Sequence, residues 1–224
     1  MLNKLTVKKI VEFNRLSEKR RSTFINQLKT PPKPKIDESG GDYWVTGLSA
    51  LGTAFKQNDN NIIKERIEPL AGKYKAANNN RNRNQFKRNL DILINYQDFD
   101  FSTLRPSTDL KFPTKSKEPL NINNTSLHVL PQHVFTYKVN DEPTVGAIWF
   151  VAWIDKFALS DLGIYSESLF KHLNQVYSNR YKVDPTYCLT VDALSMSKVS
   201  YDSVLSGKIS SLLEPSIDTL SRYL

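Results

Sequence analysis

The chain has 224 residues and a formal net charge of +8, with 39% hydrophobic and 11% aromatic residues, so it can bury a core rather than remain disordered. The longest apolar run, 145–154, spans ten residues, whereas a membrane-spanning helix needs about 20. No signal peptide is expected, because charged residues recur through Arg21, and we predict a cytoplasmic protein. The single cysteine, Cys188, excludes an internal disulfide framework and a cysteine-rich zinc site.

Residues 1–30 are predicted to form a basic segment of two short helices. Thr6 is a suitable N-cap for the first helix, and the apolar residues that follow it recur at helical spacing. The second helix is expected to begin after Ser17. Residues 31–41 combine several prolines with a Gly-Gly pair, which predicts a linker.

Residues 42–97 are predicted to form a helical domain. Apolar residues stand at i, i+4, i+7 and i+11 and indicate a buried helix face: Trp44, Leu48, Leu51 and Phe55. A second helix is expected to end or restart at Pro69, because proline lacks the N–H donor and disfavours a helical predecessor. The asparagine-rich stretch 78–84 is interpreted as a polar loop, after which helical spacing resumes.

The second half of the chain changes from helical to strand periodicity. Residues 98–126 contain three prolines and are expected to form an extended connector. In the small α/β domain, 127–224, we predict a β-hairpin, a crossover helix capped by Ser160, a third strand at 187–193 parallel to the second, and a terminal helix at 217–223. The predicted fold class is therefore α+β, a helical N-terminal half followed by a small α/β half.

The net positive charge is confined to the first half. Residues 1–120 hold 23 Lys and Arg against 13 Asp and Glu, a net charge of +10, while residues 121–224 hold 8 against 10, a net charge of −2. This asymmetry predicts that the N-terminal half faces a polyanion or an acidic partner.

One basic segment has no acidic residue between Glu68 and Asp91, and Tyr74 and several asparagines are interleaved with its cations: Lys73, Lys75, Arg81, Arg83, Lys87 and Arg88. Lys and Arg neutralise phosphates, and Asn bonds phosphates or base edges, so the mixture suits nucleic acid. A solvated loop and a site for an acidic protein are the alternative interpretations. A second basic cluster near the N-terminus supports contact with a polyanion: Lys8, Lys9, Lys19, Arg20 and Arg21.

Two aspartates follow predicted strands. If those strands are parallel, Asp155 and Asp192 share the carboxyl edge of the sheet, where with Lys156 they could hold Mg²⁺ or Mn²⁺ for phosphodiester cleavage. The order of elements resembles the core of restriction-endonuclease-like nucleases. That family carries an acidic residue and a Glu-x-Lys or Asp-x-Lys triplet on the hairpin, and the run 146–152 has neither. The alternative interpretation is that both aspartates are ordinary caps.

The remaining candidates favour structural roles. His128 and His133 are separated by a proline, which does not produce a chelating pair, and His172 lies on the long predicted helix. Cys188 lies within a predicted buried strand and lacks a local catalytic motif.

These observations predict a non-catalytic accessory or adaptor subunit of a bacterial multi-protein complex that acts on nucleic acid. An antiviral-defence assembly is one setting for such a subunit. The basic half would contact DNA, RNA or an acidic partner, and the α/β half would dock on a protein of the complex. No cofactor is expected. The alternatives are a metal-dependent nuclease with a degenerate restriction-endonuclease-like core and a scaffolding protein that binds protein only.

Overall fold

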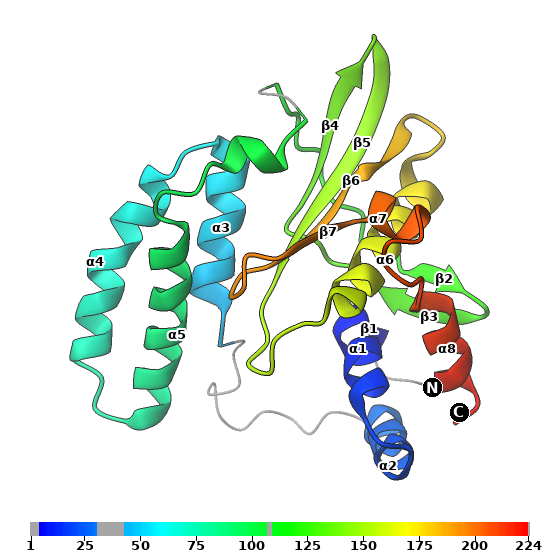
Figure 1. Cartoon of the computed structure of the whole chain (residues 1–224), viewed down its shortest axis with the longest axis horizontal. Helices are drawn as coiled ribbons and strands as arrows, with labels where there is room; N and C mark the ends of the chain where they lie inside the picture. The colour runs from blue at the N-terminus through cyan, green and yellow to red at the C-terminus, as the bar shows by residue number, and fades with distance from the viewer. Residues whose placement is uncertain (1–4, 31–42, 107–108, 224) are drawn as a thin grey trace.

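The computed structural model describes residues 5–30, 43–106 and 109–223 and confirms the α+β class (Figure 1). The predicted linker, 31–41, lies outside the described residues. The helices are α1 (Val7–Arg15), α2 (Glu18–Lys29), α3 (Val45–Gln57), α4 (Asn61–Lys75), α5 (Asn80–Tyr96), the short 3-10 helix η2 (Phe101–Leu104), α6 (Leu159–Tyr177), α7 (Tyr201–Leu205) and α8 (Leu213–Ser221). In the part of the chain that the structure describes, none of them is long and apolar enough to cross a membrane.

The main sheet has the strand order β4-β5-β6-β7. These strands are β4 (His133–Val139), β5 (Glu142–Val151), β6 (Lys182–Asp192) and β7 (Lys198–Ser200). β4 and β5 form the predicted antiparallel hairpin, and α6 crosses over to bring β6 parallel to β5. Two elements were predicted to begin too late along the chain. β6 begins at Lys182 rather than at residue 187, and the terminal helix α8 begins at Leu213 rather than at residue 217.

Glycine is required where β5 meets β6. The register between the two strands shifts between Val145 and Ala147, on either side of Gly146. A Cβ atom at Gly146 would lie 2.8 Å from the carbonyl oxygen of Tyr187, closer than real Cβ contacts allow. The backbones of the two strands therefore approach each other closely at this point.

A small second sheet was not predicted. It has the order β1-β3-β2, formed by β1 (Leu5–Thr6), β2 (Leu120–Ile122) and β3 (Thr125–His128). β1 is parallel to β3, with Leu5 opposite Leu127, and β2 lies within the stretch 98–126 that we predicted to be an extended connector. These strands are too short to show a sustained alternation in the sequence.

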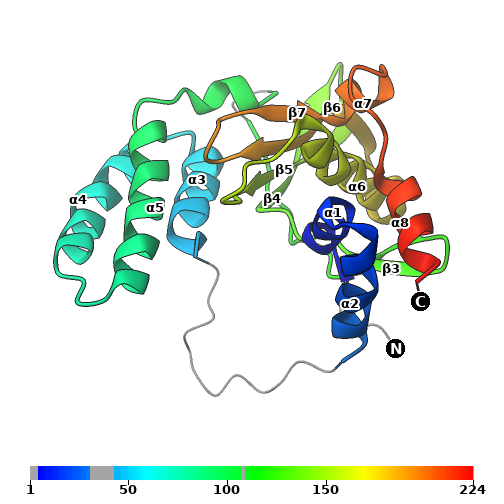
Figure 2. The ribbon, with the colours of Figure 1, turned by 60° about the horizontal axis from the view of Figure 1, so that its bottom comes forward.

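The main sheet buries both of its faces. Along β5, Ala147 belongs to a core that also includes α1, α6, α8 and the small sheet, while Ile148 and Phe150 belong to a core with α3, α4 and α5. Figures 1 and 2 show these two groups of helices on opposite sides of the sheet. Apolar packing thus joins segments of both halves of the chain.

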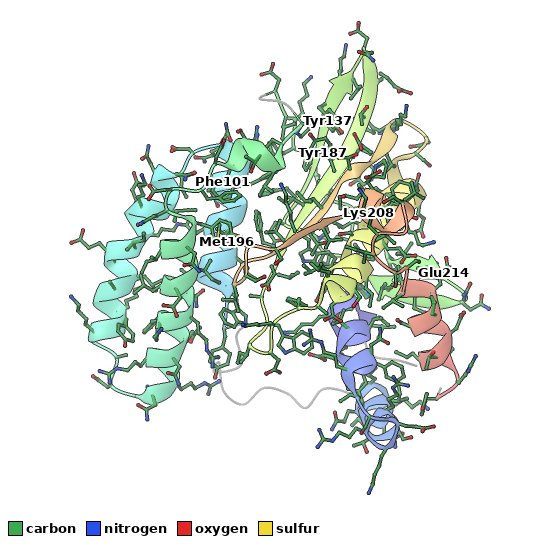
Figure 3. The ribbon with its side chains drawn as sticks, viewed as in Figure 1. Phe101, Tyr137, Tyr187, Met196, Lys208 and Glu214 are labelled. Atoms are coloured by element: carbon green, nitrogen blue, oxygen red, sulfur yellow. The ribbon has the colours of Figure 1, made fainter. Side chains whose placement is uncertain are left out.

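Aromatic side chains fill the core beneath α3. Phe55 of α3 lies 5.5 Å from Phe135 of β4, ring centre to ring centre. Farther along the sheet, Tyr137 and Tyr187 meet edge to face at 5.7 Å (Figure 3). The predicted stripe on α3 is confirmed as core, since Leu51 and Phe55 are fully buried.

Three local predictions were wrong. α4 continues through Pro69, which lies on an exposed face, where water can bond the Glu65 carbonyl that the proline leaves without a donor. The stretch 78–84 is not all loop, because Asn79 caps α5 by accepting a hydrogen bond from the backbone N–H of Asn82 at 2.8 Å. Ser160 does not cap α6, which begins at Leu159 with Ala158 in the cap position.

Candidate nucleic-acid interface

The basic segment lies at one end of the hairpin of α4 and α5. We call its six residues the hairpin basic cluster: Lys73 and Lys75 in the last turn of α4, and Arg81, Arg83, Lys87 and Arg88 in the first half of α5. All are exposed except Arg88, which is half-buried. The helix periodicity of 3.6 residues separates Arg81 and Arg88 from Arg83 and Lys87, so the cations of α5 lie on two sides of the helix.

Arg81 and Arg88 face the beginning of α3. The guanidinium group of Arg88 lies 5.6 Å from the ring centres of both Tyr43 and Trp44, and that of Arg81 lies 6.0 Å from Tyr43. Such contacts orient the guanidinium planes without neutralising their charge. The aromatic residues thus hold two cations in place at the surface.

Asn89 fixes this arrangement from below. It is 2% exposed, and its amide nitrogen donates to the carbonyl oxygens of Tyr43 and Gln85 at 2.5 and 2.8 Å. Its amide oxygen accepts from the backbone N–H of Gly47 at 2.7 Å. This buried side chain joins α5 to the beginning of α3, and no local motif marks it in the sequence.

The other side of α5 faces α4 and solvent. Arg83 lies 5.9 Å from the ring of Tyr74 on α4. Lys87 forms an exposed ion pair with Asp91 one turn along the helix at 2.8 Å, and the hydrogen bond that its ammonium group donates to that carboxylate raises the pKa of Lys87. Tyr74, noted in the sequence as an interleaved aromatic residue, is therefore in contact with a cation of the cluster.

The N-terminal basic cluster is more closely integrated with the core. Lys19 and Arg20 are exposed on α2, but Arg21 is half-buried, with its guanidinium group 5.0 Å from the ring of buried Phe13. Lys8 lies 5.7 Å from the ring of Trp153. Part of this cluster therefore stabilises the packing of α1 and α2.

Arg15 is a structural cation that the sequence did not reveal. Its guanidinium group binds the Asp161 carboxylate at 2.5 Å and the Lys156 carbonyl at 2.6 Å, and it stacks on Trp153 at 4.6 Å. Asp161 in turn accepts from the backbone N–H of Ala158 at 2.9 Å. Arg15 therefore attaches α1 to the loop between β5 and α6.

The two clusters project from the same end of the molecule. Figures 1 and 2 both place the α4–α5 turn and α2 on the lower side, with the loop that follows β5 between α3 and α1. A pocket of about 320 Å³ is lined by Lys8 of α1, Leu48 of α3 and the end of β5, with His128 and Trp149 in its wall. Of the helices that carry the two clusters, α1 borders this pocket through Lys8, and none of its lining residues in the described part of the chain belongs to α4 or α5.

The two candidate metal ligands have different surroundings. Asp192 ends β6 and is fully buried, and its carboxylate accepts from the backbone N–H of Leu194 at 3.1 Å and the Ser195 hydroxyl at 2.7 Å. Burial and the nearby charge of Asp192 raise the pKa of Tyr96. Asp155 is exposed in the loop after β5, where Lys156 adopts a left-handed backbone conformation.

The hypothesis of a metal-dependent nuclease requires parallel strands, and β5 and β6 are parallel. The carboxylate oxygens of Asp192, however, accept hydrogen bonds within the turn that follows β6. Among the residues that the structure describes, no group of three or more His, Cys, Asp and Glu side chains could hold a metal ion. The metal-dependent nuclease remains a prediction. Incubation with Mg²⁺ or Mn²⁺ and plasmid or RNA, with Asp192→Ala as the comparison, tests it.

The histidines and the cysteine occupy packed positions. His133 contacts the carbonyl oxygen of Gly52 through Nε2 at 2.8 Å, and burial lowers the pKa of both His133 and His172. Cys188 is fully buried, and burial together with the charge of Asp184 raises the pKa of its thiol well above the usual value. A buried neutral thiol is a poor nucleophile. His128 is half-buried in the wall of the pocket that Lys8 borders.

Comparison with known proteins adds no assignment. No protein-family model, no curated protein and no solved structure matches the chain.

Proposed function

We propose that the protein is a non-catalytic, nucleic-acid-binding accessory subunit of a multi-protein complex that acts on nucleic acid. The hairpin basic cluster would contact the phosphates. The observation that carries this proposal is the concentration of six cations at one end of a helical hairpin, without an acidic residue between Glu68 and Asp91.

Few of these charges are neutralised by the protein itself. Of the cluster, Lys87 alone forms an ion pair within residues 5–30, 43–106 and 109–223. Like charges held close together repel one another and attract a polyanion. Phosphate groups would supply the missing negative charge and release counterions on binding.

The aromatic neighbours support nucleic acid over an acidic protein partner. The rings of Tyr43, Trp44 and Tyr74 lie beside the arginines, as the cation–π distances of 5.6 to 6.0 Å show. Bases stack on aromatic rings and on guanidinium planes, so the same side chains that bind phosphate can also receive a base. This combination suits a single-stranded or unpaired segment of DNA or RNA.

The α/β half is proposed to dock on a protein of the complex. Several large apolar side chains of this half are 37 to 63% exposed: Leu130, Val139, Ile154, Leu159, Met196 and Leu205. Apolar atoms exposed to water favour association, and the weak net charge of this half does not oppose it.

Fluorescence anisotropy with labelled single-stranded and double-stranded DNA and RNA, at several salt concentrations, tests the basic half. We expect tight binding at low salt that weakens as salt rises. The quadruple change Arg81, Arg83, Lys87 and Arg88 to Ala should reduce the slope of log affinity against log salt by about 3 to 4.

A matched control removes the same charge elsewhere. Lys117, Lys182, Lys198 and Lys208 are all exposed, and changing these four to Ala should leave the slope nearly unchanged. The proposal fails if the unaltered protein does not bind at low salt, or if the control reduces the slope as much as the hairpin variant. Capture of protein partners from a nuclease-treated lysate by both variants separates a protein-only role from nucleic-acid binding.

A further inference from the structure

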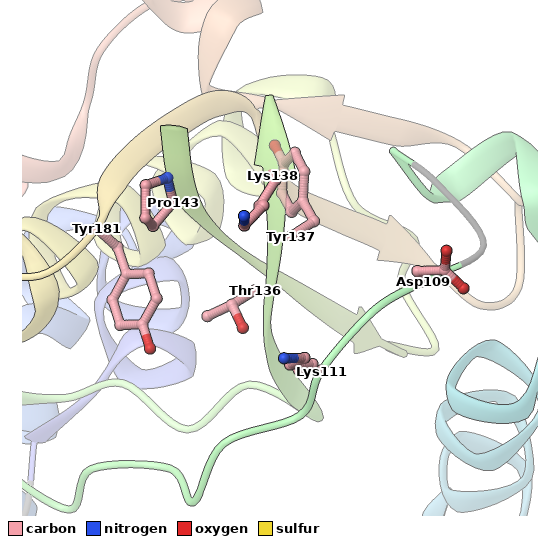
Figure 4. A pocket seen from close by; sticks show the side chains of 7 residues that line it. All are labelled: Asp109, Lys111, Thr136, Tyr137, Lys138, Pro143 and Tyr181. Carbon is pink, nitrogen blue, oxygen red and sulfur yellow. The ribbon is translucent and has the colours of Figure 1, made fainter. Parts of the chain in front are cut away.

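A second cavity lies at the outer edge of the main sheet, on a different part of the molecule from the hairpin basic cluster. It has a volume of about 500 Å³ and is lined by Asp109, Lys111, Thr136, Tyr137, Lys138, Pro143 and Tyr181 (Figure 4). Pockets for small molecules span roughly 300–1,000 Å³, so a ligand of metabolite size fits.

Backbone pairing fixes one wall of this cavity. The segment before β2 runs along the free edge of β4, where the N–H of Lys111 donates to the Thr136 carbonyl at 2.9 Å and the N–H of Thr136 donates back at 2.8 Å. This pair of hydrogen bonds holds Lys111 beside Thr136. The backbone positions of these two residues are therefore fixed relative to each other without a ligand.

Thr136 contributes a hydroxyl group to the cavity. The residue is 7% exposed, and its hydroxyl group belongs to the lining of the cavity. In Figure 4 this hydroxyl, the Tyr181 hydroxyl and the Lys111 ammonium group point to the same part of the cavity. Hydroxyl and ammonium groups can all donate hydrogen bonds, so an acceptor group of a ligand can bind at this place.

The charges of the lining favour an anionic group at this place. Lys138 supplies a second ammonium group, and its only ion pair among the described residues is the exposed contact with Asp141 at 3.3 Å. Two ammonium groups and two hydroxyls match a phosphate, which carries up to two negative charges and several acceptor oxygens. A single carboxylate has fewer acceptor positions for these donors.

The rest of the cavity suits the body of an organic molecule. Pro143 and the ring of Tyr181 provide apolar surface. Asp109 lies away from the converging donors in Figure 4, and its carboxylate can accept a hydrogen bond from a ligand hydroxyl or amino group. The cavity thus offers hydrogen-bond donors, apolar surface beside them and a carboxylate acceptor apart from them.

We infer that this cavity binds a small phosphorylated metabolite of nucleotide size. The phosphate is held by Lys111, Thr136 and Tyr181 with support from Lys138, and the hydroxyl or amino groups of the ligand face Asp109. The site does not depend on the proposed nucleic-acid interface.

Isothermal titration calorimetry of the full chain with AMP, ribose 5-phosphate and adenosine tests the inference. We expect AMP and ribose 5-phosphate to bind and inorganic phosphate to compete with them, whereas adenosine, which lacks the phosphate, should bind at least about tenfold more weakly than AMP. Binding of AMP no tighter than that of adenosine, or no binding of either phosphate ester, overturns the inference.

Two conservative variants locate the phosphate. Lys111→Met keeps the length of an exposed side chain and should weaken AMP binding about tenfold or more, and Thr136→Val keeps the shape and should weaken it severalfold. Lys117→Met, on the same segment but outside the cavity, is the matched control and should bind as the unaltered protein does.

Circular dichroism and thermal unfolding without ligand establish that each variant is folded. If either variant does not fold, Tyr181→Phe removes one donor from the same place without changing the ring. Unchanged AMP affinity in the folded variants overturns the inference. The quadruple hairpin variant should retain AMP binding, so failure of this site and failure of the nucleic-acid interface give different results.

Discussion

The two basic clusters carry the same sign of charge but differ in what surrounds each cation. In the N-terminal cluster and beside it, Arg21 lies over buried Phe13, and Arg15 binds Asp161. In the hairpin basic cluster the arginines contact surface aromatic rings, and one lysine pairs with an exposed carboxylate. The two clusters thus differ in how deeply the contacted residues are buried, fully for Phe13 and partly for Tyr43 and Tyr74, and net charge alone does not reveal this difference.

The largest expected difference between these regions is the loss of stability when a phenylalanine of each is replaced. Phe13 is fully buried and packs against Tyr223 at 5.7 Å, whereas Phe86 of α5 is only partly buried. Phe13→Ala should lower the free energy of unfolding by about 3–5 kcal/mol, because it leaves a cavity in a packed core. Phe86→Ala should lower the free energy of unfolding by clearly less. Urea unfolding followed by circular dichroism measures both, and equal losses would contradict the contrast.

A smaller effect is expected from the structural arginine. Arg15→Met removes a charged hydrogen bond to Asp161, a residue that is 8% exposed, and should lower the free energy of unfolding by about 1.5–3 kcal/mol. The matched variant Arg81→Met should change it by less than about 0.5 kcal/mol. The same unfolding experiment compares them. If the two variants lose equal stability, Arg15 has no special structural role.

Acid should destabilise the side of the molecule that holds α6. Burial lowers the pKa of His172 below 6.5 in the folded protein. As the pH falls below 6.5, His172 therefore takes up a proton in the unfolded chain before it does so in the folded protein. The contribution of neutral His172 to the free energy of unfolding is complete above pH 6.5 and decreases as the pH falls towards the lower pKa of the folded protein. His172→Leu should show a smaller drop in melting temperature between pH 7.5 and 5.5, although His133 contributes a drop of the same sign. An unchanged drop would contradict this assignment.

The smallest effect on stability is expected at the end of the hairpin. Arg83→Ala should change the free energy of unfolding by less than about 0.5 kcal/mol, since the side chain is exposed and contacts one ring. For nucleic-acid binding by this variant, the slope of log affinity against log salt should nevertheless fall by about 0.9. A loss of stability without a change in slope would assign Arg83 to the fold instead.

The sequence predicted those elements whose evidence is local. Thr6 does cap α1, accepting a hydrogen bond from the backbone N–H of Lys9, and the stripe on α3 is buried. The parallel pairing of β5 and β6 followed from the crossover helix between them. By contrast, the start of α5 was missed, because asparagine favours both loops and N-caps, and its position relative to the next apolar turn decides between them.

The remaining features depend on contacts between distant residues. Leu5 pairs with Leu127, Arg15 binds Asp161, and Lys111 pairs with Thr136, and none of these partners is marked by a local motif. The hairpin basic cluster was found from its composition alone. The cavity beside Lys111 was not, because its donors come from three separate segments of the chain.

The position of α1 has a consequence for how the chain acquires its structure. Asn14 donates to the Ser216 hydroxyl at 2.7 Å across 202 positions of sequence, and Phe13 packs on Tyr223. During synthesis, therefore, the apolar face of this early helix must wait for residues that leave the ribosome near the end of translation. The hairpin of α4 and α5 joins neighbouring segments and can form long before. Folding is then completed on the side of α1, and that face needs protection from aggregation in the meantime.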